Sequence, residues 1–383
     1  MEPEFAVSWS RKLRKNIKIL HIVDFTNKNK WFEEYLLLFA QSGMEQEIVN
    51  INVNSELSNH AENQGIPMTS SYKYLAHALQ RKLRRKDPDF ILAHGYKPSI
   101  LASVLRISGG PKFLIVHHHQ PNFFKFYKLH SHIKSFVHST LLQMTYRLCF
   151  AIQSFSLEVT NALHSKKISS TKIFENPIGM DLALLTNINQ NPDLLREKVQ
   201  SDLTIVSIGR LSWEKNYELA IQAISLLIRS GLKVNYDIYG DGPDKQVLKC
   251  LVSKLDADDF IFFKGFDSDV LTKINSYDLF LHASLTESYG QVIFEAYFLD
   301  VSILTSNVGV GLDLHELDGK NVHLFKENSP KAIADQIKAI VFEKSFLATT
   351  KKIDREVLSE HSLEKSVANL VDFLRTSFES SLK

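Results

Sequence analysis

The stretch SLTESYGQVIFEAYF, residues 284–298, decides the fold of this chain because it joins a strand end, a polar turn and a helix start. The run before it, YDLFLH at 277–282, is short and apolar, which predicts a buried parallel strand. After the turn at Gly290, the apolar side chains of 292–297 recur at the spacing of one helix face. Backbone N–H groups at such a helix start are unpaired, and they favour an anion.

Two carboxylates flank this turn. Glu287 lies in the loop and Glu295 lies in the expected helix, where Gln291 precedes it by one helical turn and shares its face. The arrangement suits a ligand with an anionic part and a diol part, since the N–H groups would bind a phosphate and a carboxylate would bind ribose hydroxyls. Two surface glutamates at a solvated helix start are the alternative that this stretch alone leaves open.

The stretch resembles the E-x7-E signature of the retaining family 4 glycosyltransferases, which are group 1 glycosyl transferases with the two-domain B-type fold. A second stretch, SIGRLSWEKN at 207–216, is similar to the family's Gly-Arg-Leu…Glu-Lys segment and follows a predicted strand. A strand end would deliver Arg210 and Lys215 to one crevice, on a turn whose Gly209 lets a ligand approach closely. A guanidinium and an ammonium would stabilise the charge of a departing nucleoside diphosphate without a metal.

The resemblance also implies roles for individual residues. Glu295 would hold the ribose, and Glu287 would bind sugar hydroxyls or position the donor. Phe266 lies near the expected place of the nucleotide base, although a packing residue is the other interpretation. The expected donor-binding residues are Gly209, Arg210, Lys215, Phe266, Ser288, Tyr289, Gly290, Gln291 and Glu295, and the expected catalytic residues are Glu287, His118, Arg210 and Lys215.

Three successive histidines, His117, His118 and His119, end a predicted strand at 112–116. Adjacent residues of a strand alternate between its faces and rarely share an ion, so a metal site is not expected here. In the resembled family one histidine at this strand end reaches the donor sugar. We take His118 as the candidate, with His117 and His119 as possible donor-sugar contacts, and surface histidines on a loop as the alternative.

A chain of 383 residues is too long for one ordinary core, and 44% hydrophobic with 23% charged residues is typical of a soluble globular protein. Strands and helices alternate, which predicts an α/β protein of two facing Rossmann-like parallel-sheet domains. We expect an acceptor-side domain at 1–185, a nucleotide-sugar-binding domain at 186–362, and a helix at 363–383 that returns to the first domain. The expected strands are 17–23, 46–51, 89–93, 112–116, 149–153, 172–174, 204–208, 234–239, 261–263, 278–281 and 301–304, and the expected helices include 31–40, 72–85, 98–107, 128–148, 217–229 and 363–378.

Cysteine usage and hydropathy suggest the compartment. Cys149 and Cys250 lie far apart in apolar surroundings, which predicts two buried thiols in a reducing cytosol. No apolar run has the length of a membrane helix, and residues 1–16 lack the apolar core of a signal peptide. We therefore expect a cytoplasmic protein.

The net charge of +2 hides an asymmetry between the two halves. Residues 1–180 carry 23 Lys and Arg against 13 Asp and Glu, a balance of +10, whereas the rest carries 22 against 30, a balance of −8. No acidic residue occurs from 90 to 157, and the segment 123–147 has the character of a basic amphipathic helix that could lie on an anionic membrane. A sheet-covering helix with a solvated basic face explains the segment equally well. No nucleic-acid motif is present, so a nucleic-acid partner is not expected.

These observations predict a retaining glycosyltransferase that moves a sugar from a nucleotide-sugar donor to a glycan or lipid-linked acceptor, in surface polysaccharide or glycolipid assembly at the inner face of the membrane. Neither a metal nor another cofactor is expected, because no carboxylate cluster accompanies the phosphate turn. Two alternatives stay open: a non-catalytic nucleotide-sugar-binding subunit, and a nucleotide-sugar epimerase of the same fold. The loop 24–30 lacks the glycine pair usual in the family, so the acceptor is not inferred.

Overall fold

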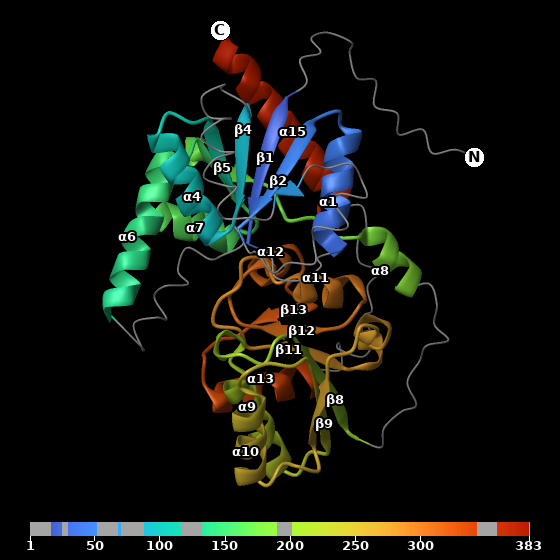
Figure 1. The fold of residues 1–383 in the computed structure, drawn as a ribbon. Coiled ribbons are helices and arrows are strands. Elements are labelled where there is room, and N and C mark those ends of the chain that lie inside the picture. The colour runs from blue at the N-terminus through green and yellow to red at the C-terminus, as the bar shows by residue number, and fades with distance from the viewer. Residues whose placement is uncertain are drawn as a thin grey trace, which may run out of the picture. The chain divides into compact units, whose positions relative to one another are not determined.

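In the computed structural model, the described residues are 17–24, 30–51, 68–69, 88–116, 132–189, 201–342 and 358–382. The chain divides into two compact units (Figure 1). One unit comprises 1–115, 148–150 and 370–383, and the other comprises 116–147 and 151–369. The predicted helix at 72–85 lies outside the described residues, and the predicted domain boundaries stay predictions.

The first sheet has seven strands in the order β3-β2-β1-β4-β5-β6-β7. Its interior strand β1 pairs in parallel with both β2 and β4. Every residue of β4 is buried, which explains why this strand is a continuous apolar run in the sequence. The strands are β1 (Lys18–Val23), β2 (Glu45–Asn50), β3 (Met68–Thr69), β4 (Phe90–His94), β5 (Lys112–Val116), β6 (Ala151–Ser154) and β7 (Ile173–Glu175), and the helices along this part of the chain are α1 (Lys30–Gln41), α4 (Tyr96–Ile107), α6 (His132–Leu148), α7 (Leu157–Ser165), the 3-10 turn η2 (Ser170–Lys172) and α8 (Leu182–Asn189).

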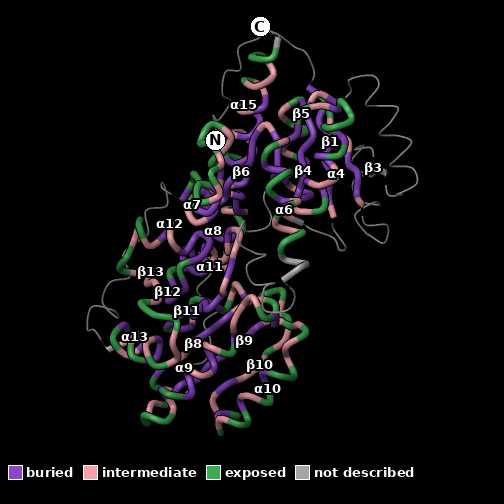
Figure 2. Tube along the Cα trace, turned by 90° about the vertical axis from the view of Figure 1, so that its left-hand side faces the viewer, coloured by how far each residue is buried: buried purple, intermediate pink, exposed green. Residues whose placement is uncertain are grey.

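The second sheet has six strands in the order β10-β9-β8-β11-β12-β13, all paired in parallel. Its core lies between the central strands and the apolar faces of α9, α10 and α13, and Figure 2 shows these strands coloured largely as buried. The strands are β8 (Leu203–Ile208), β9 (Val234–Tyr239), β10 (Ile261–Gly265), β11 (Leu279–His282), β12 (Ile303–Thr305) and β13 (Val322–Leu324), and the helices are η4 (Trp213–Lys215), α9 (Tyr217–Arg229), α10 (Lys245–Lys254), η5 (Val270–Thr272), η6 (Ile274–Ser276), α11 (Gln291–Phe298), α12 (Val310–Leu317) and α13 (Pro330–Phe342).

The strand order of the second sheet locates its binding edge. The chain leaves β8 toward β9 on one side and later returns to β11 on the other side, so the order reverses between β8 and β11. Ligands of parallel sheets bind beyond the carboxyl ends of the strands at such a switch point. A ligand is therefore expected at the turns that follow Ile208 and His282.

The last helix, α15 (Leu363–Leu382), packs its second half against the first sheet. Arg375 donates a hydrogen bond of 2.8 Å from Nη2 to the Ser42 carbonyl oxygen. The ring of Phe373 stacks on Phe150 with centroids 5.7 Å apart, and Phe378 meets Phe90 edge-on at 6.4 Å.

The prediction that both cysteine thiols are buried is correct for Cys149 and wrong for Cys250. Cys149 is buried, but Cys250 is exposed on α10. This helix buries Leu248 and Val252, and Cys250 stands two residues from each, on the opposite face of an amphipathic helix. Local apolar surroundings in the sequence do not reveal which side of a helix is covered.

Within the described ranges, no helix combines the length and the apolar character needed to cross a membrane.

Candidate functional site

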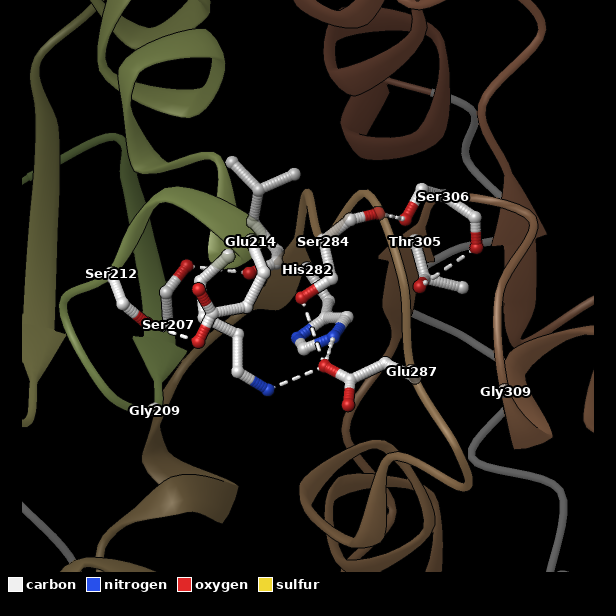
Figure 3. A network of polar contacts seen from close by, with 12 residues as sticks. Ser207, Gly209, Ser212, Glu214, His282, Ser284, Glu287, Thr305, Ser306 and Gly309 are labelled. Atoms are coloured by element: carbon white, nitrogen blue, oxygen red, sulfur yellow. Dashed lines mark hydrogen bonds and ion pairs between the residues drawn. The ribbon is translucent and has the colours of Figure 1, made fainter. Parts of the chain in front are cut away.

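Glu287 is the centre of the polar network at the switch point. Its Oε1 accepts hydrogen bonds from His282 Nε2 at 3.0 Å and from Ser284 Oγ at 2.9 Å, and it forms an ion pair with Lys215 Nζ. Figure 3 shows the imidazole of His282 and the hydroxyl of Ser284 directed at this carboxylate. Lys215 ends η4 after β8, whereas the other three residues follow or end β11, so the network joins two strand-end turns.

The network holds Glu287 as an anion. Burial by itself would raise the pKa of Glu287, but the hydrogen bond from His282 and the positive charge of Lys215 outweigh it and lower the pKa to about 2. Burial lowers the pKa of His282 below 6.5, with Glu287 opposing that shift. A neutral His282 that donates its Nε2 proton to the carboxylate satisfies both groups.

The second oxygen of Glu287 differs from the first. All three partners recorded among the described residues bind Oε1, which leaves Oε2 without a hydrogen bond in that part of the chain. The side chains of Lys215 and Glu287 are only 19% and 12% exposed. The site therefore presents one fixed carboxylate oxygen beside a largely desolvated ammonium group.

Glu295, the second carboxylate of the sequence motif, lies in α11 and is half-buried. Burial raises its pKa to about 7, so it gains a full charge only above neutral pH. Within the described residues the carboxyl group of Glu295 has no hydrogen bond or ion pair, and Gln291 is exposed at the first position of the same helix. A half-buried carboxyl group that has no partner among the residues described suits hydroxyl donors from a ligand.

The other predicted donor residues are distributed around this centre. Arg210 is exposed, and its guanidinium group has no hydrogen bond or ion pair in the described part of the chain. Phe266 follows β10 and is 83% exposed. Tyr289 is buried, and its hydroxyl lies 2.9 Å from His361 Nδ1, so only its backbone could face a ligand. The structure thus brings Lys215 and Glu287 into contact and leaves Arg210 and Phe266 exposed.

Glycines allow the strand-end turns to approach one another. A Cβ atom on Gly240, after β9, would lie 1.9 Å from the Gly209 carbonyl oxygen, and one on Gly242 would lie 2.3 Å from the Leu211 carbonyl oxygen. The motif GDGP at 240–243 is therefore explained by backbone packing beneath the β8 turn.

Sequence reasoning missed His282 and Ser284, and it placed the loop 307–312, which contains Gly309, near the donor with a plain turn as the alternative. His282 is the polar last residue of an otherwise apolar strand, which is a signal that the sequence does carry. Gly309 has a φ of 56°, and a Cβ there would lie 2.2 Å from the Tyr289 carbonyl oxygen. The loop that precedes α12 therefore packs directly on the Glu287 turn.

His117, His118 and His119 lie outside the described residues, so their predicted part in donor-sugar contact stays a prediction. Within the described ranges, no group of three or more His, Cys, Asp or Glu side chains could hold a metal ion.

The two parallel sheets define a class by fold, namely the α/β proteins with the B-type glycosyltransferase fold. Residues 195–356 match the family model described as glycosyl transferases group 1. The chain is 27% identical over 186 residues to the GtfA subunit of a UDP-N-acetylglucosamine–peptide N-acetylglucosaminyltransferase from Streptococcus parasanguinis, covering 46% of this chain and 36% of that protein. It is 25% identical over 227 residues to alpha-monoglucosyldiacylglycerol synthase from Acholeplasma laidlawii, covering 53% of this chain and 57% of that one.

The chain thus spans about a third of the streptococcal relative and little more than half of the Acholeplasma one. Among solved structures, HepE from Anabaena in complex with UDP has a similar fold, with a TM-score of 0.72 at 16% identity. The match covers 94% of this chain and all of that one.

Proposed function

We propose that the protein is a retaining glycosyltransferase that moves a sugar from a nucleotide-sugar donor to a glycan or lipid-linked acceptor. The observation that carries the proposal is the Lys215–Glu287 pair at the carboxyl ends of β8 and β11, in a domain of the group 1 family. A nucleoside diphosphate is the leaving group, and it gains negative charge as the glycosidic bond breaks. Lys215 and the exposed Arg210 stabilise that charge in the transition state.

The remaining polar groups bind the rest of the donor. Glu295 accepts hydrogen bonds from the ribose hydroxyls, and Oε2 of Glu287 accepts one from the sugar. The N–H groups of 288–290, at the start of α11, favour the phosphate. The acceptor attacks from the face that the diphosphate leaves, and a diphosphate oxygen takes the acceptor proton. The two cations supply the charge that a metal would otherwise supply.

The experiment that tests this proposal begins with the nucleotide. UDP, GDP, ADP and CMP are each added to the protein, and a nucleotide that binds the native state raises the thermal midpoint. We expect UDP to give the largest shift, because relatives with UDP in their names or complexes share this fold. If none of the four nucleotides raises the thermal midpoint and the protein also fails to hydrolyse nucleotide sugars, the proposed donor site is refuted.

Incubation with UDP-sugars in the absence of acceptor separates the alternatives. A transferase hydrolyses its donor slowly, an epimerase returns an isomerised donor, and a non-catalytic subunit binds the donor and leaves it unchanged. Retention is read from the anomeric configuration of the transferred sugar by NMR, and an inverted product would refute the retaining mechanism.

We also propose that the protein docks on anionic lipid at the cytoplasmic face of the membrane, where a lipid-linked acceptor would lie. Helix α6 exposes Phe136, Val137 and Met144 together with Arg147, within the span 90–157 that lacks acidic residues. Exposed apolar and basic side chains on one helix suit an interfacial surface.

Co-sedimentation tests this surface with phosphatidylglycerol vesicles against phosphatidylcholine vesicles. We expect binding to the anionic vesicles alone, weakened by high salt and by the changes Phe136→Ser and Arg147→Glu. Arg229→Glu, at an exposed position near the end of α9, is the matched control. Lys125, Lys128 and Lys134 are further sites for charge reversal, although their side chains lie outside those that the structure describes. Equal binding to both kinds of vesicle would refute the electrostatic part of the proposal.

A further inference from the structure

Helices α7 and α12 each begin at a carboxylate that belongs to the other helix. Glu158, near the start of α7, accepts the Gly309 N–H at 2.7 Å on Oε2, and Gly309 is the N-cap residue of α12. In return, Asp313 of α12 accepts the Leu157 N–H at 3.1 Å on Oδ1 and 3.3 Å on Oδ2, and Leu157 is the first residue of α7. The two carboxylates therefore satisfy the orphan N–H groups of two helix starts reciprocally.

This reciprocal pair joins segments that are remote in the chain. Helix α7 follows β6 of the seven-stranded sheet, whereas α12 follows β12 of the six-stranded sheet. Glu158 and Gly309 are 151 positions apart, and Leu157 and Asp313 are 156 positions apart. Ser156 adds a long hydrogen bond of 3.4 Å from its hydroxyl to the Ser288 carbonyl oxygen, in the Glu287 turn itself.

The start of α12 is packed tightly against that turn. The Val310 N–H donates to the Tyr289 carbonyl oxygen at 2.5 Å. A Cβ on Gly309 would lie 2.2 Å from the same oxygen and 2.9 Å from Glu287 Cβ, so only a glycine permits this approach. A displacement of Gly309 would therefore displace the turn that carries Glu287.

The Glu158–Gly309 and Asp313–Leu157 contacts are hydrogen bonds from backbone N–H groups to carboxylates, not ion pairs between two exposed side chains. Charge-assisted hydrogen bonds to a helix N-terminus are among the stronger kind, and both lie at part-buried positions. Burial raises the pKa of Asp313 to about 6, the Leu157 hydrogen bond opposes that shift, and the negative charges of Glu316 and Glu175 add to it. Its buried and acidic surroundings thus disfavour the ionised form of Asp313, and the hydrogen bond from α7 partly offsets that cost.

We propose that Glu158 and Asp313 form a carboxylate clasp between α7 and α12 that positions the Gly309 loop and, through it, the Glu287 turn for donor binding. Both are positioning residues, because they act through the turn and make no contact with the proposed donor themselves. The proposal rests on the proposed function for its link to the donor, but the clasp itself is testable in the ligand-free protein.

The first measurement is amide hydrogen exchange of the ligand-free protein at 285–291 and 307–312. We expect about tenfold faster exchange at both segments in Glu158→Ala and in Asp313→Ala, the rate change that corresponds to about 1.4 kcal/mol. Glu158→Gln retains an acceptor oxygen and should restore most of the protection. Asp335→Ala, which removes an exposed carboxylate on α13, is the matched control and should leave exchange unchanged. Unchanged exchange in both alanine variants would overturn the clasp.

The second measurement is the dissociation constant of UDP by calorimetry, together with kcat and KM for a UDP-sugar. We expect UDP to bind about tenfold more weakly in each alanine variant, with KM raised more than kcat is lowered and with recovery in Glu158→Gln. The double variant should lose less than the product of the two single losses, because the contacts act as one unit. Faster exchange with unchanged UDP affinity would overturn the link to the donor.

The two failures can be told apart. A wild-type protein that binds no UDP would contradict the proposed donor, whereas the exchange experiment would still decide the clasp. Circular dichroism and the thermal midpoint identify a variant that fails to fold, and in that case Glu158→Gln and Asp313→Asn provide the comparison.

Discussion

Replacing Lys215 with methionine keeps most of the length of the side chain and removes the charge that pairs with Glu287. The pKa of Glu287 falls from 4.5 to about 2 in the folded protein, which corresponds to about 3 kcal/mol in favour of the ionised carboxylate. Lys215 is one of three partners at the same oxygen, so its loss should lower the free energy of unfolding by about 1–2 kcal/mol at pH 7. The thermal midpoint should fall by about 2–8 °C, and kcat/KM by about 10²–10³-fold.

The pH dependence of this loss has a definite sign. A carboxyl whose folded pKa is depressed contributes stability above its unfolded pKa of about 4.5, and that contribution disappears as pH falls toward about 2. Scanning calorimetry should therefore show a large difference between wild type and Lys215→Met at pH 7, which narrows by pH 3. The control is Lys18→Met, because its 3.6 Å pair with Glu45 leaves both side chains about half exposed and should contribute below about 1 kcal/mol. An unchanged midpoint and unchanged kcat/KM in Lys215→Met would refute the reasoning.

Three further outcomes follow from the site. Arg210→Ala should lower kcat/KM by about 10²–10³-fold without moving the thermal midpoint, because Arg210 is exposed, and normal turnover would remove it from the diphosphate site. Burial raises the pKa of Glu295 to about 7, so UDP affinity measured by calorimetry should rise from pH 6 to pH 8 as this acceptor of ribose hydroxyls ionises, and Glu295→Gln should show a flat profile; a pH-dependent variant would contradict the assignment. Transfer should survive EDTA, and activity that is lost to the chelator and restored by Mn²⁺ or Mg²⁺ would show that a metal takes part.

Local pattern was enough to predict most of the strands and helices. Parallel strands that are covered on both faces are continuous apolar runs, so β4 and β11, which are buried throughout, could be located to within one or two residues. A strand end followed by a turn and a helix is also a local signal. It predicts that Lys215 and Glu287 lie on strand-end turns, and it does not predict the contact between them.

The partners of those residues depended on the tertiary structure. The pairing of Lys215 with Glu287 requires β8 and β11 to be neighbours, and the order of strands is not written in the periodicity of either one. The same holds for the exposed face of α10 that carries Cys250, since which side of a helix is covered depends on what packs against it.

The clasp shows this difference most plainly. Glu158 stands in the first turn of α7, where any carboxylate would be favourable to its own helix, and nothing near it in the sequence indicates Gly309. Only the folded chain brings that N–H within 2.7 Å, across 151 positions. Hydrophobic periodicity and turn chemistry depend on residues a few positions apart, so they are visible in the sequence. A hydrogen bond between remote loops forms only when the sheets have assembled and the backbone at Gly309 lies close to the Glu287 turn.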